Sequence, residues 1–253
     1  LGDYLLNWFA QLLQFPERKT GTVPLIKGIT RCGKNLPFNI FQRYVINPSL
    51  SITCADMEKV FGRFNSIQQG KLLIVLDEAL DCKNRAMNQR IKNAVTEETN
   101  QIEQKGKDII EVQNFCNYAI LTNNDFSSII EKNDARYICI EANGEKKGDK
   151  AYFQDLVNTC ANTVAGKHIF HWLLKRDLTD FYSDEIPETQ YKKELKVKQS
   201  CTVIRWLLSY HQQLSDNGTI GVITKSPTKW YEEYNTWCNA SGEKKILSIN
   251  PFG

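Results

Sequence analysis

The chain has 253 residues, with 32 Lys and Arg against 29 Asp and Glu, so its formal net charge is +3 at pH 7. This near balance excludes a polycationic nucleic-acid arm, and any basic surface has to be local. Hydrophobic residues make up 42% and charged residues 24%, with only 14 Gly and 7 Pro, which excludes collagen-like, low-complexity and broadly disordered chains. The length predicts one large domain and at most one smaller domain beside it.

The 8 cysteines stand singly, without a Cys-x-x-Cys pair, which is typical of free thiols in a reducing compartment. No apolar run approaches the roughly 20 residues that a membrane-spanning helix needs. We therefore expect an intracellular, soluble protein without a membrane partner. Because the sequence does not begin with Met, we also expect it to be part of a longer chain.

The first elements alternate between helix and strand. Apolar residues recur at helical spacing over residues 4–13, and Pro16 closes this predicted helix. The apolar run at residues 23–28 predicts a strand, the polar turn after it a loop, and the segment from Lys34 another helix.

Further apolar runs at residues 72–76, 118–122 and 137–140 predict buried strands, and each of the first two ends in polar residues. These runs are apolar throughout instead of alternating, which indicates strands covered on both faces. The predicted fold class is therefore α/β, with a central parallel sheet flanked by helices.

Beyond the hydrophilic loop at residues 144–150 the pattern turns helical. A polar stretch around Pro187 is the predicted linker, so we place the domains at residues 1–188 and 189–253. The second domain contains a predicted helix from residue 203 and a last helix with Ser226 as N-cap, Pro227 at its first position and Gly242 after its end. We interpret it as a truncated winged-helix-like module.

A candidate phosphate-binding loop follows the first predicted strand. Residues 28–35 match Gly-x-x-x-x-Gly-Lys, with Asn35 where the pattern has Ser or Thr. The glycines let backbone N–H groups surround phosphate oxygens, and the lysine reaches the β- and γ-phosphates. The alternative is a chance Gly-rich turn. The predicted nucleotide ligands are Gly28, Thr30, Arg31, Cys32, Gly33, Lys34 and Asn35.

Acidic residues end the strand at residues 72–76. Asp77 is predicted to bind nucleotide-bound Mg²⁺, with the Asn35 carbonyl as a further metal ligand, and Glu78 to polarise the attacking water. This pair strengthens the loop assignment, since hydrolysis of a phosphoanhydride requires both roles. The alternative is an acidic helix N-cap behind a core strand.

Two residues near later strands complete the predicted catalytic set. Asn123, after the strand at 118–122, could orient the water or contact the γ-phosphate. Arg136, just before the strand at 137–140, could act as an arginine finger on the nucleotide of a neighbouring subunit. The alternative for Arg136 is a surface arginine where a strand begins.

The segment Lys105-Gly106-Lys107 lies between apolar residues and predicts the tip of a β-hairpin. Lys105 and Lys107 could hold a phosphate backbone without reading its sequence. Arg85, Arg90 and Lys92 could extend this basic path. Solvated lysines on an ordinary hairpin, and a solvated helix face, are the alternatives.

With these elements in this order, the chain resembles the superfamily 3 helicases of DNA viruses, most closely the helicase part of poxvirus-type primase-helicases and their relatives in giant viruses, virophages and phages. The similar blocks before the linker are Asn7–Ala10, Gly33–Asn35, Leu76–Ala79, Ile102–Asp108, Thr122–Asn124 and Asp134–Tyr137. Those near or after it are Leu174–Phe181, Pro187–Thr189 and Trp230–Cys238.

The resemblance implies an AAA+-like P-loop NTPase that forms a hexameric ring, with ATP and Mg²⁺ between subunits and single-stranded DNA in the central channel. It also implies a viral protein acting in the host cytoplasm or nucleus, with a primase fused or associated. Two positions depart from the family pattern: Asn35 replaces the hydroxyl residue, and Ala135 stands where many relatives have the first of two arginines.

The sequence hypothesis is therefore an ATP-dependent DNA helicase motor for viral genome replication. Asn35 and Ala135 motivate a first alternative, an inactive ring-forming scaffold that binds DNA without turnover. A second alternative is a P-loop enzyme acting on a small molecule, for which the sequence offers no recognisable acceptor-binding region.

Overall fold

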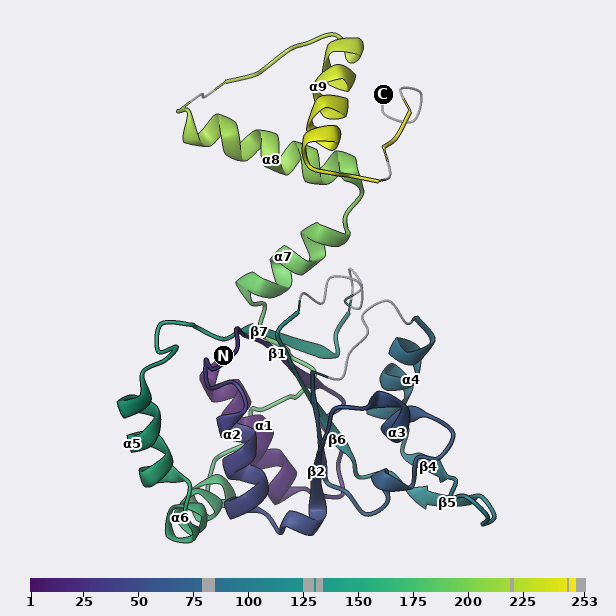
Figure 1. The fold of residues 1–253 in the computed structure, drawn as a ribbon, viewed down its shortest axis with the longest axis vertical. Coiled ribbons are helices and arrows are strands. Elements are labelled where there is room, and N and C mark those ends of the chain that lie inside the picture. The colour runs from purple at the N-terminus through teal and green to yellow at the C-terminus, as the bar shows by residue number, and fades with distance from the viewer. Residues whose placement is uncertain (79–84, 125–129, 131–133, 219–220, 245, 249–253) are drawn as a thin grey trace. The chain divides into compact units, whose positions relative to one another are not determined.

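The computed structural model describes residues 1–78, 85–124, 130, 134–218, 221–244 and 246–248. Ala79, part of one similarity block, and the side chain of Arg85 lie outside the described residues. The chain divides into two compact units, Leu1–Lys193 and Glu194–Gly253 (Figure 1). The boundary predicted at residue 188 lies in the same stretch of chain. Each unit is described by itself.

The first unit is built on a parallel sheet of five strands in the order β2-β3-β6-β1-β7. The strands are β1 (Val23–Lys27), β2 (Ser51–Cys54), β3 (Leu73–Asp77), β6 (Asn117–Thr122) and β7 (Tyr137–Glu141). The predicted α/β class with a central parallel sheet is therefore confirmed. Strands β1, β3, β6 and β7 are those that the apolar runs predict, and β6 is buried along its whole length because both of its faces are covered.

Strand β2 was not predicted from the sequence. It has only four residues, and Ile52 and Thr53 are not buried. An edge strand of this length produces no continuous apolar run, so periodicity gives no signal for it.

Helices cover both faces of the sheet (Figure 1). On one face lie α1 (Gly2–Gln14), α2 (Leu36–Ile40), the π-helical turn η1 (Phe41–Val45), α5 (Lys150–Cys160) and α6 (Thr163–Leu174). On the other lie α3 (Met57–Phe61) and α4 (Arg85–Thr96). Short 3₁₀ turns are η2 (Pro48–Leu50) and η3 (Ser66–Gln68).

The core between α1 and the sheet is apolar at its centre, and hydrogen bonds at its border join α1 to the sheet. Trp8 and Leu12 are fully buried on the inner face of α1. The Trp8 indole N–H donates to Thr20 Oγ1 at 3.0 Å, and the Thr20 backbone N–H donates to Asn117 Oδ1 at 2.9 Å, which ties the helix to the start of β6. On α6, a Cβ added at Gly166 would lie 2.1 Å from the Tyr44 carbonyl oxygen, so only glycine allows α6 to approach η1 this closely.

Strands β4 (Thr99–Ile102) and β5 (Ile110–Gln113) form the predicted antiparallel hairpin, and Gly106 at its tip has φ +76°. At the end of β4 that leads into the turn, the Asn65 side chain holds the hairpin against the rest of the first unit. Asn65 Nδ2 donates to the Gln101 carbonyl at 2.8 Å, and the Glu103 N–H donates to Asn65 Oδ1 at 3.0 Å. The hairpin prediction is confirmed.

The second unit contains most of α7 (Gln190–Gln199), with α8 (Thr202–Asp216) and α9 (Pro227–Ala240). Trp206, Tyr234 and Cys238 form its buried cluster. The last helix begins as predicted, with Ser226 Oγ accepting the Lys229 N–H. The described part of this unit contains no strand, so its winged-helix character stays a prediction.

None of the helices in the described ranges combines the length and apolar character needed to span a lipid bilayer.

Candidate functional site

The candidate site lies where three neighbouring strands end. The loop of residues 28–35 follows β1, Asp77 and Glu78 stand at the end of β3, and Asn123 follows β6. In the sheet these strands are adjacent in the order β3-β6-β1 and run parallel. Because the carboxyl ends of parallel strands meet at one edge, residues far apart in the sequence come together there.

Asn123 joins the cation of the loop to the acid at the end of β3. Its Oδ1 accepts a hydrogen bond of 2.6 Å from Lys34 Nζ, and its Nδ2 donates to Glu78 Oε1. Lys34 and Glu78 are also within 3.8 Å of each other. The Lys34 side chain is only 7% exposed, so the ammonium depends on these partners, whereas Glu78 is 56% exposed and open to water.

Asn35 contacts the other acid of β3. Its Nδ2 donates to Asp77 Oδ2 at 2.6 Å, which fixes the orientation of both side chains. Asp77 Oδ1 is buried, and no donor among the described residues reaches it. A buried carboxylate oxygen without a donor is costly, and a hard cation or a water bound to one would relieve that cost.

The backbone of the site takes up uncommon conformations. Arg31 has φ 66°, Gly33 φ 89° and Glu78 φ 53°. A Cβ at Gly33 would lie 2.6 Å from the Phe153 ring, and one at Gly28 would lie 2.6 Å from Cys32 Sγ. Both loop glycines are therefore required by close contacts, and the strained Arg31 and Glu78 flank the cluster, as strain at functional sites commonly does.

The loop borders a cavity of about 390 Å³, which holds most of the predicted nucleotide ligands together. Its lining includes Thr30, Arg31, Cys32, Gly33, Lys34, Asn35, Asn39, Glu78 and Phe153. The structure thus brings together the loop residues, both acids and Asn123, through cavity lining or direct hydrogen bonds.

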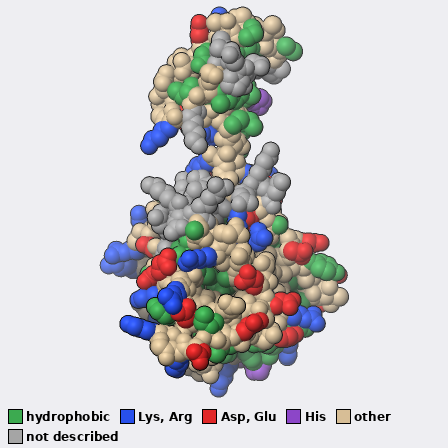
Figure 2. Space-filling model, turned by 90° about the vertical axis from the view of Figure 1, so that its right-hand side faces the viewer, with side chains coloured by type: hydrophobic (Ala, Val, Ile, Leu, Met, Phe, Trp, Pro, Cys, Tyr) green, Lys and Arg blue, Asp and Glu red, His purple; other side chains and the backbone are tan. Residues whose placement is uncertain are grey.

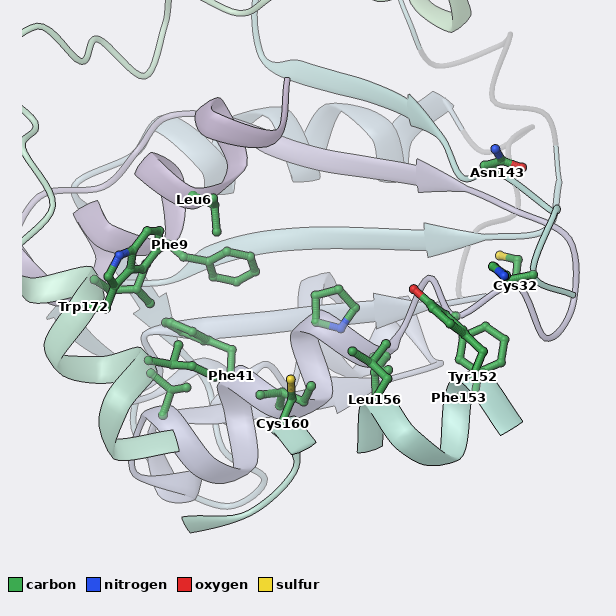
Figure 3. A pocket seen from close by; sticks show the side chains of 18 of the residues that line it. Leu6, Phe9, Cys32, Phe41, Asn143, Tyr152, Phe153, Leu156, Cys160 and Trp172 are labelled. Carbon is green, nitrogen blue, oxygen red and sulfur yellow. The ribbon is translucent and has the colours of Figure 1, made fainter. Parts of the chain in front are cut away.

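A larger apolar cavity of about 550 Å³ adjoins the same loop. Cys32, Gly33, Leu36 and Phe153 border both cavities. In Figure 3, Tyr152 and Phe153 lie beside Cys32 at one end, and aromatic side chains including Phe9 and Trp172 lie at the other. Sequence reasoning missed this cavity because its walls come from α1, α2, α5 and α6, whose apolar residues read individually as ordinary core.

Arg136 does not join this cluster in its own chain. It stands just before β7, and its carbonyl accepts the Val23 N–H at 2.8 Å, at the start of β1. The loop of residues 28–35 follows the far end of β1, after Lys27. The five residues of β1, at about 3.3 Å each, separate this loop from Arg136 by roughly 15 Å. Arg136 therefore lies at the opposite edge of the sheet.

Lys105 and Lys107 are exposed at the hairpin tip. The hairpin leads into β6, so it also lies toward the edge of the sheet where strands begin. On the face of the first unit that carries α3 and α4, basic and acidic side chains are interspersed (Figure 2).

Comparison with known proteins finds two similarities, one to a family of unknown function and one to a phage DNA primase-polymerase. Residues 26–136 match a family of unknown function (DUF5906). The chain is 28% identical over 234 residues to a DNA primase-polymerase of Nitratiruptor phage NrS-1, covering 87% of this chain and 31% of that protein. The chain thus spans about a third of that relative's length.

Solved structures of the NrS-1 C-terminal region share the fold. An A-form apo structure aligns with TM-score 0.67 and 20% identity, over 91% of this chain and 56% of that one. A second apo structure, of residues 305–718, aligns with TM-score 0.66 and 21% identity, over 87% and 55%.

The bridging role of Asn123 predicts a measurable cost when its side chain is removed. Asn123→Ala leaves the buried Lys34 ammonium without its amide acceptor, and we expect a loss of about 1–2 kcal/mol in the free energy of unfolding, measured in urea. Asn124→Ala is the matched control because Asn124 is exposed. Equal stability of the two variants would show that Asn123 does not support Lys34.

Proposed function

We propose that this chain is an ATP-hydrolysing motor that moves on single-stranded DNA during viral genome replication, in the manner of a superfamily 3 helicase. The observation that carries the proposal is the convergence of Lys34, Asn35, Asp77, Glu78 and Asn123 on one edge of the sheet. This set contains a phosphate-binding cation, a metal-binding carboxylate, a base for water and a polar residue between them, which are the parts that phosphoanhydride hydrolysis uses.

The residues present fit ATP with Mg²⁺. Mg²⁺ would neutralise charge on the β- and γ-phosphates. The buried Asp77 Oδ1 and the Asn35 side chain are placed to hold that ion or its waters, and Lys34 to contact the phosphates. In this assignment Asn35 replaces the loop hydroxyl by keeping the hydrogen bond to Asp77. The apolar cavity beside Gly33 suits the adenine ring of the nucleotide.

Glu78 is the proposed base that orients the attacking water. It is the most exposed member of the cluster, and the Asn123 amide holds one of its oxygens. Asn123 also accepts a hydrogen bond from Lys34, so its position can change when Lys34 binds a γ-phosphate. Asn123 is therefore the proposed sensor, which links phosphate binding to the position of the base.

We further propose that Arg136 acts in trans. An arginine about 15 Å from the loop of its own chain cannot reach that chain's γ-phosphate, but it can face the nucleotide of a neighbour in a head-to-tail ring. We propose that six identical subunits form this ring. Arg136 would then stabilise transition-state charge at the interface.

The proposed DNA contact is the hairpin tip, where Lys105 and Lys107 are exposed and the preceding end of β4 is held by Asn65. A ring would repeat these cations along a strand and hold its phosphates without reading bases. The similarity to a phage primase-polymerase supports a role in DNA replication and makes a fused or associated primase the proposed partner.

The first test is ATP hydrolysis with and without oligo-dT. We expect hydrolysis that DNA stimulates, and a loss of about 100-fold or more in kcat for Lys34→Ala and for Glu78→Gln, because each removes a charge that acts in the transition state. Lys59→Ala, an exposed lysine on α3, is the control and should keep wild-type rates.

Nucleotide and DNA binding without hydrolysis in the wild type would contradict the motor and support the non-hydrolysing scaffold. Hydrolysis that persists in Lys34→Ala would locate the activity elsewhere.

Action in trans predicts complementation between two inactive variants. Lys34→Ala keeps its arginine, and Arg136→Ala keeps its phosphate loop, so a mixed ring contains interfaces at which both are intact. Random 1:1 mixing should restore about a quarter of wild-type hydrolysis, since one interface in four then combines both elements. A mixture no more active than its components would contradict the assignment of Arg136.

The hairpin assignment predicts a change in the salt dependence of DNA binding. Lys105→Ala/Lys107→Ala should weaken oligo-dT binding at low salt and lower the slope of log K against log salt by about 1.4, or 0.7 for each lost phosphate contact. Lys167→Ala/Lys175→Ala, with the same charge change on exposed positions near α6, serves as the control. An unchanged slope in the hairpin variant would place the DNA elsewhere.

A further inference from the structure

A buried ion pair joins α4 to the segment that precedes Arg136. Lys92 Nζ on α4 lies 3.9 Å from Asp134 Oδ2, and the two side chains are 8% and 0% exposed. Neither residue belongs to the cluster around Lys34. Because Lys92 is buried, it does not extend the exposed basic path that the sequence suggested. Charges this deeply buried need a partner to offset their lost hydration, so each residue restricts where the other can be.

Asp134 also sets the backbone of the arginine segment. Its Oδ1 accepts the Arg136 N–H at 2.8 Å and the Tyr137 N–H at 3.3 Å, while Oδ2 faces Lys92. One carboxylate therefore fixes the turn into β7 with hydrogen bonds to one oxygen. Its other oxygen, which accepts no hydrogen bond from the described residues, lies at ion-pair distance from Lys92 on α4. A shift of Lys92 would therefore displace the Asp134 carboxylate, and with it the backbone N–H of Arg136.

Helix α4 is in turn fixed to the hairpin. It ends at Thr96, and β4 begins at Thr99. The carbonyls of Ala94 and Glu97 accept hydrogen bonds from Lys19 Nζ, at 2.5 and 2.9 Å, and from Asn114 Nδ2, at 3.1 and 3.0 Å. Asn114 directly follows β5, so both ends of the hairpin are connected to the last turn of α4.

We propose that the Lys92–Asp134 ion pair is a positioning device that couples DNA at the hairpin to the orientation of Arg136. The inference rests on the proposed function and deepens it, because it names the route by which a bound strand would change the arginine that serves the neighbouring nucleotide. Displacement of the hairpin moves the last turns of α4 and Lys92, and Asp134 transfers that movement to the turn before β7. Lys92 and Asp134 act through Arg136 and are not catalytic residues.

The alternative is an ion pair that only stabilises the fold. In that case its loss lowers stability without changing how Arg136 responds to DNA. Coupling is a difference between two states, so the decisive measurement compares the same segment with and without DNA.

The test is hydrogen exchange of the whole chain, with and without oligo-dT, in variants that keep side-chain shape. Lys92→Met keeps the length and removes the charge. Asp134→Asn keeps an oxygen that can accept the Arg136 N–H. Lys59→Met, an exposed lysine on α3, is the control. Lys92→Met/Asp134→Asn removes both charges together and is used if either single variant does not fold.

We expect oligo-dT to change exchange at the hairpin and at residues 134–137 in the wild type and in Lys59→Met. In the ion-pair variants the change should persist at the hairpin and disappear at 134–137. Their DNA-stimulated hydrolysis should fall at least about 5-fold, the lower end of typical coupling, with basal hydrolysis retained.

The inference is overturned if residues 134–137 respond to DNA equally in the ion-pair variants, or if they do not respond in the wild type. Failure of the motor proposal has a different signature. If the wild type does not hydrolyse ATP but exchange at 134–137 still responds to DNA through Lys92, the coupling stands and the assignment of the activity fails.

Discussion

The hydrogen bond between the Lys34 ammonium and the Asn123 amide is the interaction on which the candidate site depends. It holds the loop of residues 28–35 against the end of β6, which lies between β1 and β3, and the same amide donates to Glu78. A nearly buried ammonium needs such an acceptor, since most of its hydration has been lost. The site is therefore organised around the Lys34 cation.

The parallel sheet separates two groups of candidate functional residues, one at each end of its strands. The edge where strands end carries the cation, the acids and Asn123, while Arg136 and the base of the hairpin lie toward the edge where strands begin. Helix α4 lies between Glu78 and the hairpin in the chain, and its Lys92 contacts the arginine segment through Asp134. The proposed DNA contact and the proposed trans-acting arginine thus lie on the side of the sheet away from the Lys34 cluster.

Most of the first unit could be predicted because its signals are local. Continuous apolar runs identified β1, β3, β6 and β7, and the Lys-Gly-Lys tip identified the hairpin. The short edge strand β2 gave no such signal, because two of its four residues are not buried. The large cavity was also missed: residues such as Phe9, Phe41 and Trp172 have the same pattern whether they fill a core or line a cavity.

Sequence alone determined the kinds of groups available: a glycine-flanked lysine, two adjacent acids after a buried strand, an asparagine after the next, and an isolated arginine before the last. Their residue types and local elements are written in short stretches of chain. Only the tertiary structure decided their distances, because strand order is a long-range property. It placed Asn123 between Lys34 and Glu78, turned Asn35 toward Asp77, and put Arg136 at the far edge, beyond the reach of its own loop.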